Sequence, residues 1–302
     1  IPANVGSIGN YAFCNCTSLA SVTCLSVNPP SLSYNHEAFN NNANGRKIYV
    51  PSESVDAYKE DYYWKEYEDA IEAIRIKTAA EAVKGDYAMA DGTFISKDVT
   101  LTDTEKSNVR GIVFWTESEE GYATLTSDEI LKKDFPNCNH GLIVSLKDVA
   151  EQTAWQTTAD FVHTFQTDGF TDPDKSSYKS IYCQYDDATG TINSILGYQN
   201  TKILKAYNDQ CTAANKVLPI VSLATWEQSN PAPTNTTGWY LPSEKELSLL
   251  CGNDVENLFI TKKPGTDNKD FINDILGGLS SSYKLQEAYY WSSTEYSSAN
   301  NY

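Results

Sequence analysis

An acidic loop at residues 168–174 carries the side chains best suited to bind a metal ion. It reads Asp-Gly-Phe-Thr-Asp-Pro-Asp, with carboxylates at Asp168, Asp172 and Asp174. Calcium prefers carboxylate oxygens on a loop, but this spacing does not match the calcium loop of an EF-hand. Aspartate, glycine and proline are also the usual residues of turns. We therefore predict a turn and no bound metal or cofactor, and the three aspartates are the candidates if a metal does bind.

The residue types that most often catalyse reactions are not arranged for catalysis. The three histidines, His36, His140 and His163, do not combine with serine and aspartate in the order of a catalytic triad, and no Gly-x-Ser-x-Gly motif is present. The seven cysteines form no C-x-x-C pair and no zinc-type cluster with histidine. We interpret most cysteines as small buried apolar residues and His140, next to an apolar stretch, as structural. The sequence predicts a protein without enzymatic activity.

Two segments rich in aromatic and hydroxyl groups could form a recognition surface. Residues 238–247 read Gly-Trp-Tyr-Leu-Pro-Ser-Glu-Lys-Glu-Leu, and residues 290–295 read Tyr-Trp-Ser-Ser-Thr-Glu. In the first, Ser243 and Glu246 have the spacing of a capping box after a proline, which predicts a helix start. The second favours a strand that runs into a polar loop. The commoner role of such segments is scaffold, as caps and buried aromatic residues. The alternative is an exposed ligand-binding surface, for which we select Trp291, Ser293, Thr294, Glu295 and Tyr296.

The overall charge excludes some classes of partner. The 302 residues include 40 Asp and Glu against 23 Lys and Arg, a net charge of −17. This charge disfavours binding to nucleic acid or to an anionic membrane surface. No apolar run approaches the roughly 20 residues of a membrane span, so we expect no membrane insertion. The length allows two domains.

The first residues contain a repeat. Residues 1–24 read Ile-Pro-x-x-Val-x-x-Ile-Gly-x-x-Ala-Phe-x-x-Cys-Thr-Ser-Leu-x-x-Val-x-Cys, and the pair Ala12-Phe13 recurs 26 residues later as Ala38-Phe39. The alternating pair Val22 and Cys24 recurs at the same offset, which indicates stacked coils. The pattern closely resembles the leucine-rich repeat of the BspA type, a bacterial surface-adhesin repeat. Because a few coils rarely fold alone, we expect further repeats before Ile1 or another partner for this end.

A helical segment is predicted to close the repeat. Residues 51–76 begin with Pro51 and Ser52 and then place apolar residues at about helical spacing. The segment resembles the one that closes BspA-type arrays, and we expect it to cover the last coil. The Ala/Lys/Glu stretch at 77–84 then predicts a linker.

The remaining residues combine strand and helix patterns. Residues 85–94 contain an Asp-Gly pair that predicts a hairpin, and 110–115 and 140–146 are strongly apolar strand candidates. Helices are expected from Asn200, over 242–251, and over 268–276, the last ended by Gly277-Gly278. Strands with segregated helices indicate an α+β fold.

These motifs, together with the two segments above, resemble the lectin-like domain at the C-terminus of collagen-like bacterial adhesins. The resemblance implies a C-type-lectin-like fold for residues 85–302. That family continues beyond the Trp-Ser-Ser-Thr-Glu string with another hairpin, so we expect the domain to be truncated at Tyr302. The Glu-Pro-Asn or Gln-Pro-Asp triplet and the Trp-Asn-Asp string of calcium-dependent lectins are absent.

Both resemblances imply a bacterial adhesion protein that is extracellular or on the cell surface. Its partner would be a host or microbial glycan or a surface protein, bound by the lectin-like domain. The alternative is a structural subunit or tip component of a surface fibre. An enzyme on a formylglycine-generating-enzyme-like fold is disfavoured, since no reactive cysteine pair is recognisable. The predicted architecture is a short leucine-rich-repeat solenoid end with a helical cap at 1–76, a linker at 77–84 and a C-type-lectin-like α+β domain at 85–302.

Overall fold

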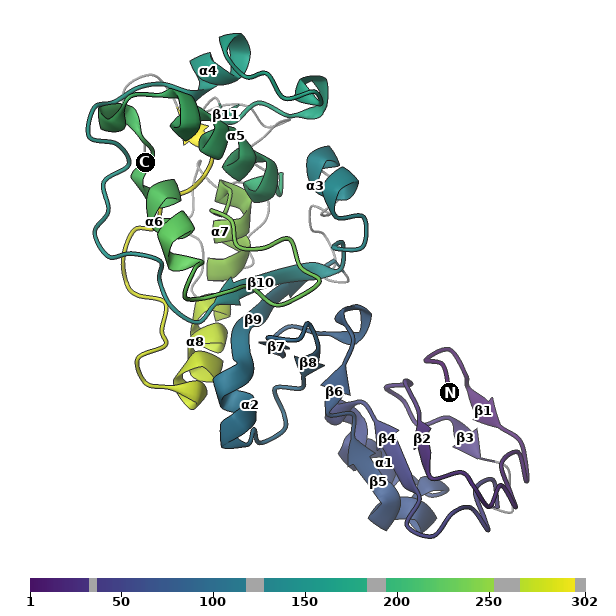
Figure 1. The fold of residues 1–302 in the computed structure, drawn as a ribbon. Coiled ribbons are helices and arrows are strands. Elements are labelled where there is room, and N and C mark those ends of the chain that lie inside the picture. Colours follow the sequence, from purple (N-terminus) through teal and green to yellow (C-terminus); the bar gives the residue numbers. More distant parts are fainter. Residues whose placement is uncertain (33–36, 118–127, 184–193, 253–266, 297–302) are drawn as a thin grey trace. The chain divides into compact units, whose positions relative to one another are not determined.

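The computed structural model describes residues 1–32, 37–117, 128–183, 194–252 and 267–296 (Figure 1). The fold mixes helices and strands and divides into two compact units. The first unit comprises residues 1–77 and 95–101, and the second comprises 78–94 and 102–302. In the described part of the chain, no helix combines the length and the apolar character needed to cross a membrane.

Parallel strands with a fixed offset organise the first unit. Strand β2 (Ser21–Thr23) pairs with β4 (Lys47–Val50), and Val22 lies opposite Ile48, 26 residues later. The rings of Phe13 and Phe39 stack with the same offset, 5.3 Å between centroids and 1° between planes. The sequence offset therefore coincides with the pairing register. A second parallel pair joins β1 (Ser7–Ile8) to β3 (Ser31–Leu32).

The segment expected to be helical as far as residue 76 is broken. It forms a 3-10 turn (Ser52–Ser54), α1 (Val55–Glu60), a longer 3-10 helix (Trp64–Ala70) and then β5 (Ile71–Ala73). The helix prediction is wrong for β5, which pairs in parallel with β4 and places buried Ile71 opposite Ile48. Pairing with an existing ladder outweighs the weak helical periodicity of these few residues. Short β6 (Ile76–Lys77) follows.

Aromatic side chains hold the helical part of the first unit against residues 26–30. The Tyr58 hydroxyl donates to the Ser26 carbonyl at 2.8 Å, and the Trp64 indole N–H donates to the Pro30 carbonyl at 2.7 Å. Both side chains are fully buried, with ring centroids 4.9 Å apart. The segment thus covers apolar surface while satisfying the polar groups of its own aromatic residues.

An antiparallel sheet forms the centre of the second unit. Its strands lie in the order β10 (Gly141–Ser145), β9 (Val109–Thr116), β7 (Tyr87–Met89) and β8 (Phe94–Ile95). The predicted Asp-Gly turn joins β7 to β8, with Gly92 at a φ of +83°. Both apolar strand candidates are strands, and β9 is almost wholly buried. Helices α7 (Glu244–Gly252) and α8 (Asp267–Leu279) pack against β9.

The other helices gather around a second apolar core. Figure 1 shows α4, α5 and α6 on the far side of β10 from α2. Their buried face includes Val162, Ile203, Leu204 and Ile220.

The expected end of α8 at Gly277-Gly278 is wrong, since both glycines lie inside the helix. Glycine in a helix interior costs only about 1 kcal/mol relative to alanine, so it does not have to end the helix. The remaining bounds are α2 (Asp103–Asn108), α3 (Glu129–Asp134), α4 (Val162–Asp168), α5 (Gly197–Gln210), α6 (Leu218–Trp226), and the parallel pair β11 (Tyr182–Cys183) and β12 (Glu295–Tyr296); short 3-10 turns lie at Ala79–Glu81, Lys175–Ser177 and Ala213–Asn215.

Candidate functional site

The two aromatic and hydroxyl-rich segments meet at the start of α7. The Ser293 N–H donates to the Pro242 carbonyl at 2.7 Å, and the Glu244 N–H donates to the Thr294 hydroxyl at 3.2 Å. Thr294 therefore satisfies one of the free N–H groups at the helix start, as a capping side chain does. Ser293 is fully buried. This part of the predicted surface forms an internal joint.

Glu295 performs a similar task for a different helix. Its carboxylate accepts the N–H groups of Val162, at 3.1 Å, and His163, at 2.7 Å, which begin α4. The side chain is 4% exposed, and burial raises the pKa of the carboxyl. The expectation of exposed groups is therefore wrong for Ser293 and Glu295. Glu295 is buried as a cap of a distant helix start, and Ser293 is buried beside Pro242, where its hydroxyl accepts from the Asn200 amide at 3.4 Å.

Trp291 is half-buried and lies beside Trp155, with ring centroids 5.5 Å apart. Its indole N–H donates to the Thr153 carbonyl at 2.6 Å. The backbone of Tyr296 pairs with Cys183 in the β11–β12 ladder, and its side chain lies outside the described residues. Ligand binding by these five residues stays a prediction.

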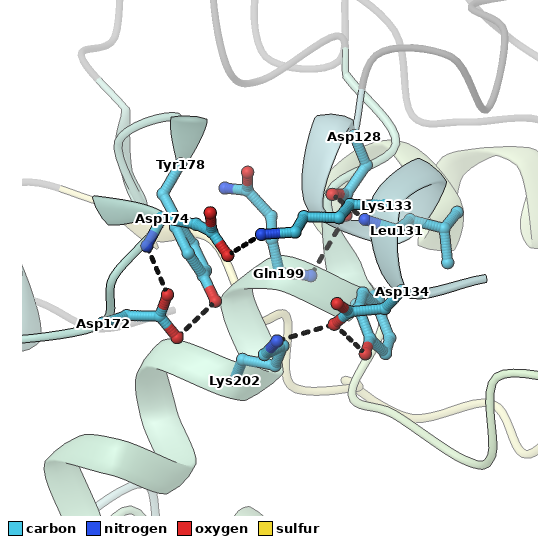
Figure 2. Close-up of polar contacts among 10 residues, drawn as sticks. Asp128, Leu131, Lys133, Asp134, Asp172, Asp174, Tyr178, Gln199 and Lys202 are labelled. Atoms are coloured by element: carbon cyan, nitrogen blue, oxygen red, sulfur yellow. Dashed lines mark hydrogen bonds and ion pairs between the residues drawn. The ribbon is translucent and has the colours of Figure 1, made fainter. Parts of the chain in front are cut away.

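The acidic loop makes an ion pair and turn contacts (Figure 2). Asp174 accepts from Lys133 Nζ at 2.5 Å, and Asp172 accepts from the Tyr178 hydroxyl at 3.1 Å and from the Asp174 N–H at 2.8 Å. Asp168 is the last residue of α4. Within the described ranges, no group of three or more His, Cys, Asp or Glu side chains could hold a metal ion. Asp172 and Asp174, two of the three carboxylates considered for a metal, thus hold their own loop and α3.

The described histidines contact a hydroxyl and a backbone carbonyl, and His163 Nδ1 lies 3.5 Å from the exposed Ser180 hydroxyl. His140 Nε2 lies 2.9 Å from the Ala82 carbonyl, a structural contact. None of the seven cysteines forms a disulfide, and only Cys24 and Cys183 are buried, so the interpretation of most as buried apolar residues is wrong. Burial of its sulfur raises the pKa of the Cys138 thiol, which disfavours the reactive thiolate.

A cavity of about 320 Å³ lies beside β10 in the second unit. Its size falls within the range typical of ligand sites. The run from His140 to Ala150 lines it continuously, and Pro219, Leu223, Trp239 and Leu276 contribute to the other walls. Most of this lining is apolar. Of the predicted site residues, Trp291 contributes to the wall.

The backbone beside the cavity is the edge of the sheet. Strand β10 pairs with β9 on one side, and within the described residues no strand pairs with its other side. A bulge between Leu142 and Ile143 interrupts the register. An unpaired edge offers backbone donors and acceptors to another extended segment.

Charged and aromatic groups mark the rim of the cavity. Lys147 Nζ lies 5.2 Å from the centre of the Tyr283 ring. The Tyr290 hydroxyl donates to Asp148 at 3.2 Å, and burial raises the pKa of the Asp148 carboxyl. This arrangement suits the binding of an apolar extended segment better than acid–base chemistry. Sequence reasoning missed the cavity, although the apolar run at 140–146 marked one of its walls.

Comparison with known proteins relates the chain to fimbrial proteins of Bacteroides ovatus ATCC 8483. The chain is 31% identical over 230 residues to a proposed fimbrium tip subunit, Fim1C, covering 72% of this chain and 40% of that protein. It also matches the crystal structure of a fimbrial protein with a TM-score of 0.55 and 26% identity, covering 85% of this chain and 46% of the other. No protein-family model matches.

The chain thus spans less than half the length of each of these two relatives. The similarity supports a fimbrial type of protein at the cell surface or outside the cell, as predicted from the sequence. It also favours a structural role over catalysis. The alternative considered above, a component of a surface fibre, has better support from these relatives than the adhesion role.

Proposed function

We propose that the protein is a structural component of a bacterial surface fibre. The similarity to a proposed fimbrium tip subunit and to a fimbrial protein of known structure carries this proposal. The negative charge suits an extracellular protein that must not bind indiscriminately.

The cavity beside β10 gives the proposal a structural basis. An extended segment of another fibre subunit would pair with the free edge of β10 and place its apolar side chains among Leu142, Trp239 and Trp291. Strand addition of this kind obtains affinity from backbone hydrogen bonds and specificity from side-chain pockets. It would also cover an edge that otherwise invites aggregation.

The location can be tested in the organism that produces the protein. Fibres are sheared from the cells, purified and probed with antibodies raised against the second unit. The proposal predicts that the protein co-purifies with the fibres and that deletion of its gene alters their subunit composition. Recovery of the protein solely in the cytoplasmic fraction would contradict it.

Adhesion is the second candidate function. We propose that the first unit is the end of a leucine-rich-repeat array and that the second unit has a C-type-lectin-like fold. The 26-residue register between β2 and β4 supports the first assignment, and the sequence motifs of the second unit support the other. The ligand would be a glycan or a surface protein.

A binding screen distinguishes the two functions. The full chain would be tested on a glycan array and against mucin and matrix proteins, with calcium and with EDTA. Reproducible binding of a ligand would favour adhesion if that binding competes with assembly into fibres, or if the protein binds the ligand but does not assemble into fibres. Co-purification with fibres without any such hit would favour the structural role.

A further inference from the structure

Two buried carboxylates hold the start of α5. The Gly197 N–H donates to Glu246 Oε2 at 3.0 Å, and the Gln199 N–H donates to Asp128 Oδ2 at 3.1 Å. Both acids are only 1% exposed. They come from segments 49 and 71 residues away in the chain. Two of the free N–H groups at the start of α5 are therefore satisfied by remote acidic side chains.

Each acid also caps a second helix. Asp128 Oδ1 accepts the Leu131 N–H at 2.8 Å at the start of α3, as Figure 2 shows together with the contact to Gln199. Glu246 accepts the Ser243 N–H at 2.6 Å and the Ser243 hydroxyl at 2.7 Å beside α7. The carboxylates of Asp128 and Glu246, here called the α5 carboxylate pair, thus join α3, α5 and α7.

The backbone is shaped to admit this contact. A Cβ atom on Gly197 would collide with the Glu246 carboxylate and would lie 2.7 Å from the Tyr240 ring. A real Cβ does not come so close to a neighbour, so the position requires glycine. The Tyr240 hydroxyl completes the site by donating to Glu246 Oε1 at 2.8 Å.

Burial makes the charged form of both acids costly. Desolvation raises the pKa of Asp128 and of Glu246, and the charge of Asp128 raises that of Glu246 further. Backbone N–H donors oppose this rise without cancelling it. Among the described residues, Lys179, Tyr198 and Tyr240 also interact electrostatically with the pair, and Cys138 interacts with Tyr240.

We propose that the α5 carboxylate pair is a proton-linked joint that makes the second unit more stable in mild acid than at neutral pH. An acid whose pKa is higher in the folded than in the unfolded chain binds more protons when folded. The bound proton adds no stability at a pH well above the pKa of the acid in the folded chain. Its contribution grows as the pH falls towards the pKa of the same acid in the unfolded chain, which is roughly 4. A fibre component would thereby keep its helices joined in an acidic surrounding.

The test is the thermal unfolding of the intact chain between neutral pH and about pH 5. Five of the six tryptophans belong to the second unit, so tryptophan fluorescence reports chiefly on it. High salt screens the exposed charges but affects the buried pair much less. The proposal predicts that the midpoint rises towards acid by roughly 3 °C or more. A midpoint that stays constant or falls would overturn it.

Variants assign the effect to the pair. In Glu246→Gln, an amide oxygen can replace Oε2 while Tyr240 turns its hydroxyl, so the fold should survive and the rise towards acid should shrink by half or more. Half-buried Glu244 and Asp148 and buried Glu295 also have raised pKa values, so part of the rise should remain. Asp209→Asn, an exposed change on the same helix, should keep the full rise. Equal slopes in Glu246→Gln and the unchanged chain would reject the proposal.

A second measurement needs no variant. Calorimetry near pH 6, in two buffers of different ionisation enthalpy, counts the protons exchanged on unfolding. The proposal predicts net proton release, since the folded chain holds the extra protons. Net uptake, or no exchange, would overturn it even if Glu246→Gln fails to fold.

Discussion

Glu295 and His163 lie 132 residues apart in the chain, yet the carboxylate of the first accepts the backbone N–H of the second at 2.7 Å. This contact fixes the C-terminal segment to the start of α4. The Trp-Ser-Ser-Thr-Glu string therefore belongs to the framework of the second unit before any ligand is considered.

Replacement of Glu295 by alanine should destabilise the second unit by about 1–3 kcal/mol, because two backbone N–H groups lose their acceptor in a buried site. Urea unfolding measures the change. Thr294→Ser keeps the hydroxyl that caps α7 and should cost much less. Unchanged stability together with lost ligand binding would instead assign Glu295 to a ligand site.

The first unit should depend on the stacked phenylalanines unequally. Phe39 is 1% exposed and contacts Phe13, Trp64 and Tyr67, whereas Phe13 is half-buried. Phe39→Ala should cost about 3–5 kcal/mol, and Phe13→Ala clearly less. Amide hydrogen exchange over residues 47–50 reports the stability of this unit. Equal effects of the two substitutions would contradict the difference in burial between the two rings.

Calcium should leave the thermal midpoint unchanged. Lys133 and Tyr178 already occupy Asp174 and Asp172, so an ion would have to displace an ion pair and a hydrogen bond. Scanning calorimetry with millimolar calcium and with EDTA provides the comparison. A higher midpoint in calcium that disappears in Asp172→Asn would show that the loop is a metal site.

The rim of the cavity should respond to alkaline pH through Tyr290. Burial, together with the nearby Asp148 charge, raises the pKa of Tyr290 to about 12. A raised folded pKa means that its stabilising contribution is complete below the ordinary value of about 10 and is lost as the pH rises through about 12. Difference absorbance of tyrosinate between the unchanged chain and Tyr290→Phe measures this step. A difference spectrum that titrates at the ordinary value would refute the contact with Asp148.

Local patterns predicted the elements that depend on local sequence. The apolar runs at 110–115 and 140–146 are strands, the Asp-Gly pair is a turn, and the 26-residue offset is a pairing register. The predictions are wrong where the structure of a segment depends on contacts with residues far away in the sequence. The β5 segment pairs with a strand formed some 20 residues earlier, and Glu295 caps a helix that begins at Val162.

The cavity illustrates the same limit at the site. Its lining joins β10, α6, α8 and the segment around Trp239, which lie far apart in the sequence. The spacing of residues within each segment does not indicate that these segments pack together in the fold. The high propensity of Tyr, Trp and Thr for strands also gave residues 290–294 a strand pattern, whereas β12 begins only at Glu295.

Photo-crosslinking in the producing organism shows whether the free edge of β10 accepts a strand from another subunit. A photoreactive amino acid at Ala150, which is exposed and lines the cavity, would be compared with one at exposed Asp209 on α5, outside the cavity. We expect Ala150 to cross-link to an extended segment of another fibre subunit and Asp209 to form no such cross-link. Equal cross-linking from both positions, or none from Ala150 in assembled fibres, would contradict a strand-accepting edge at β10.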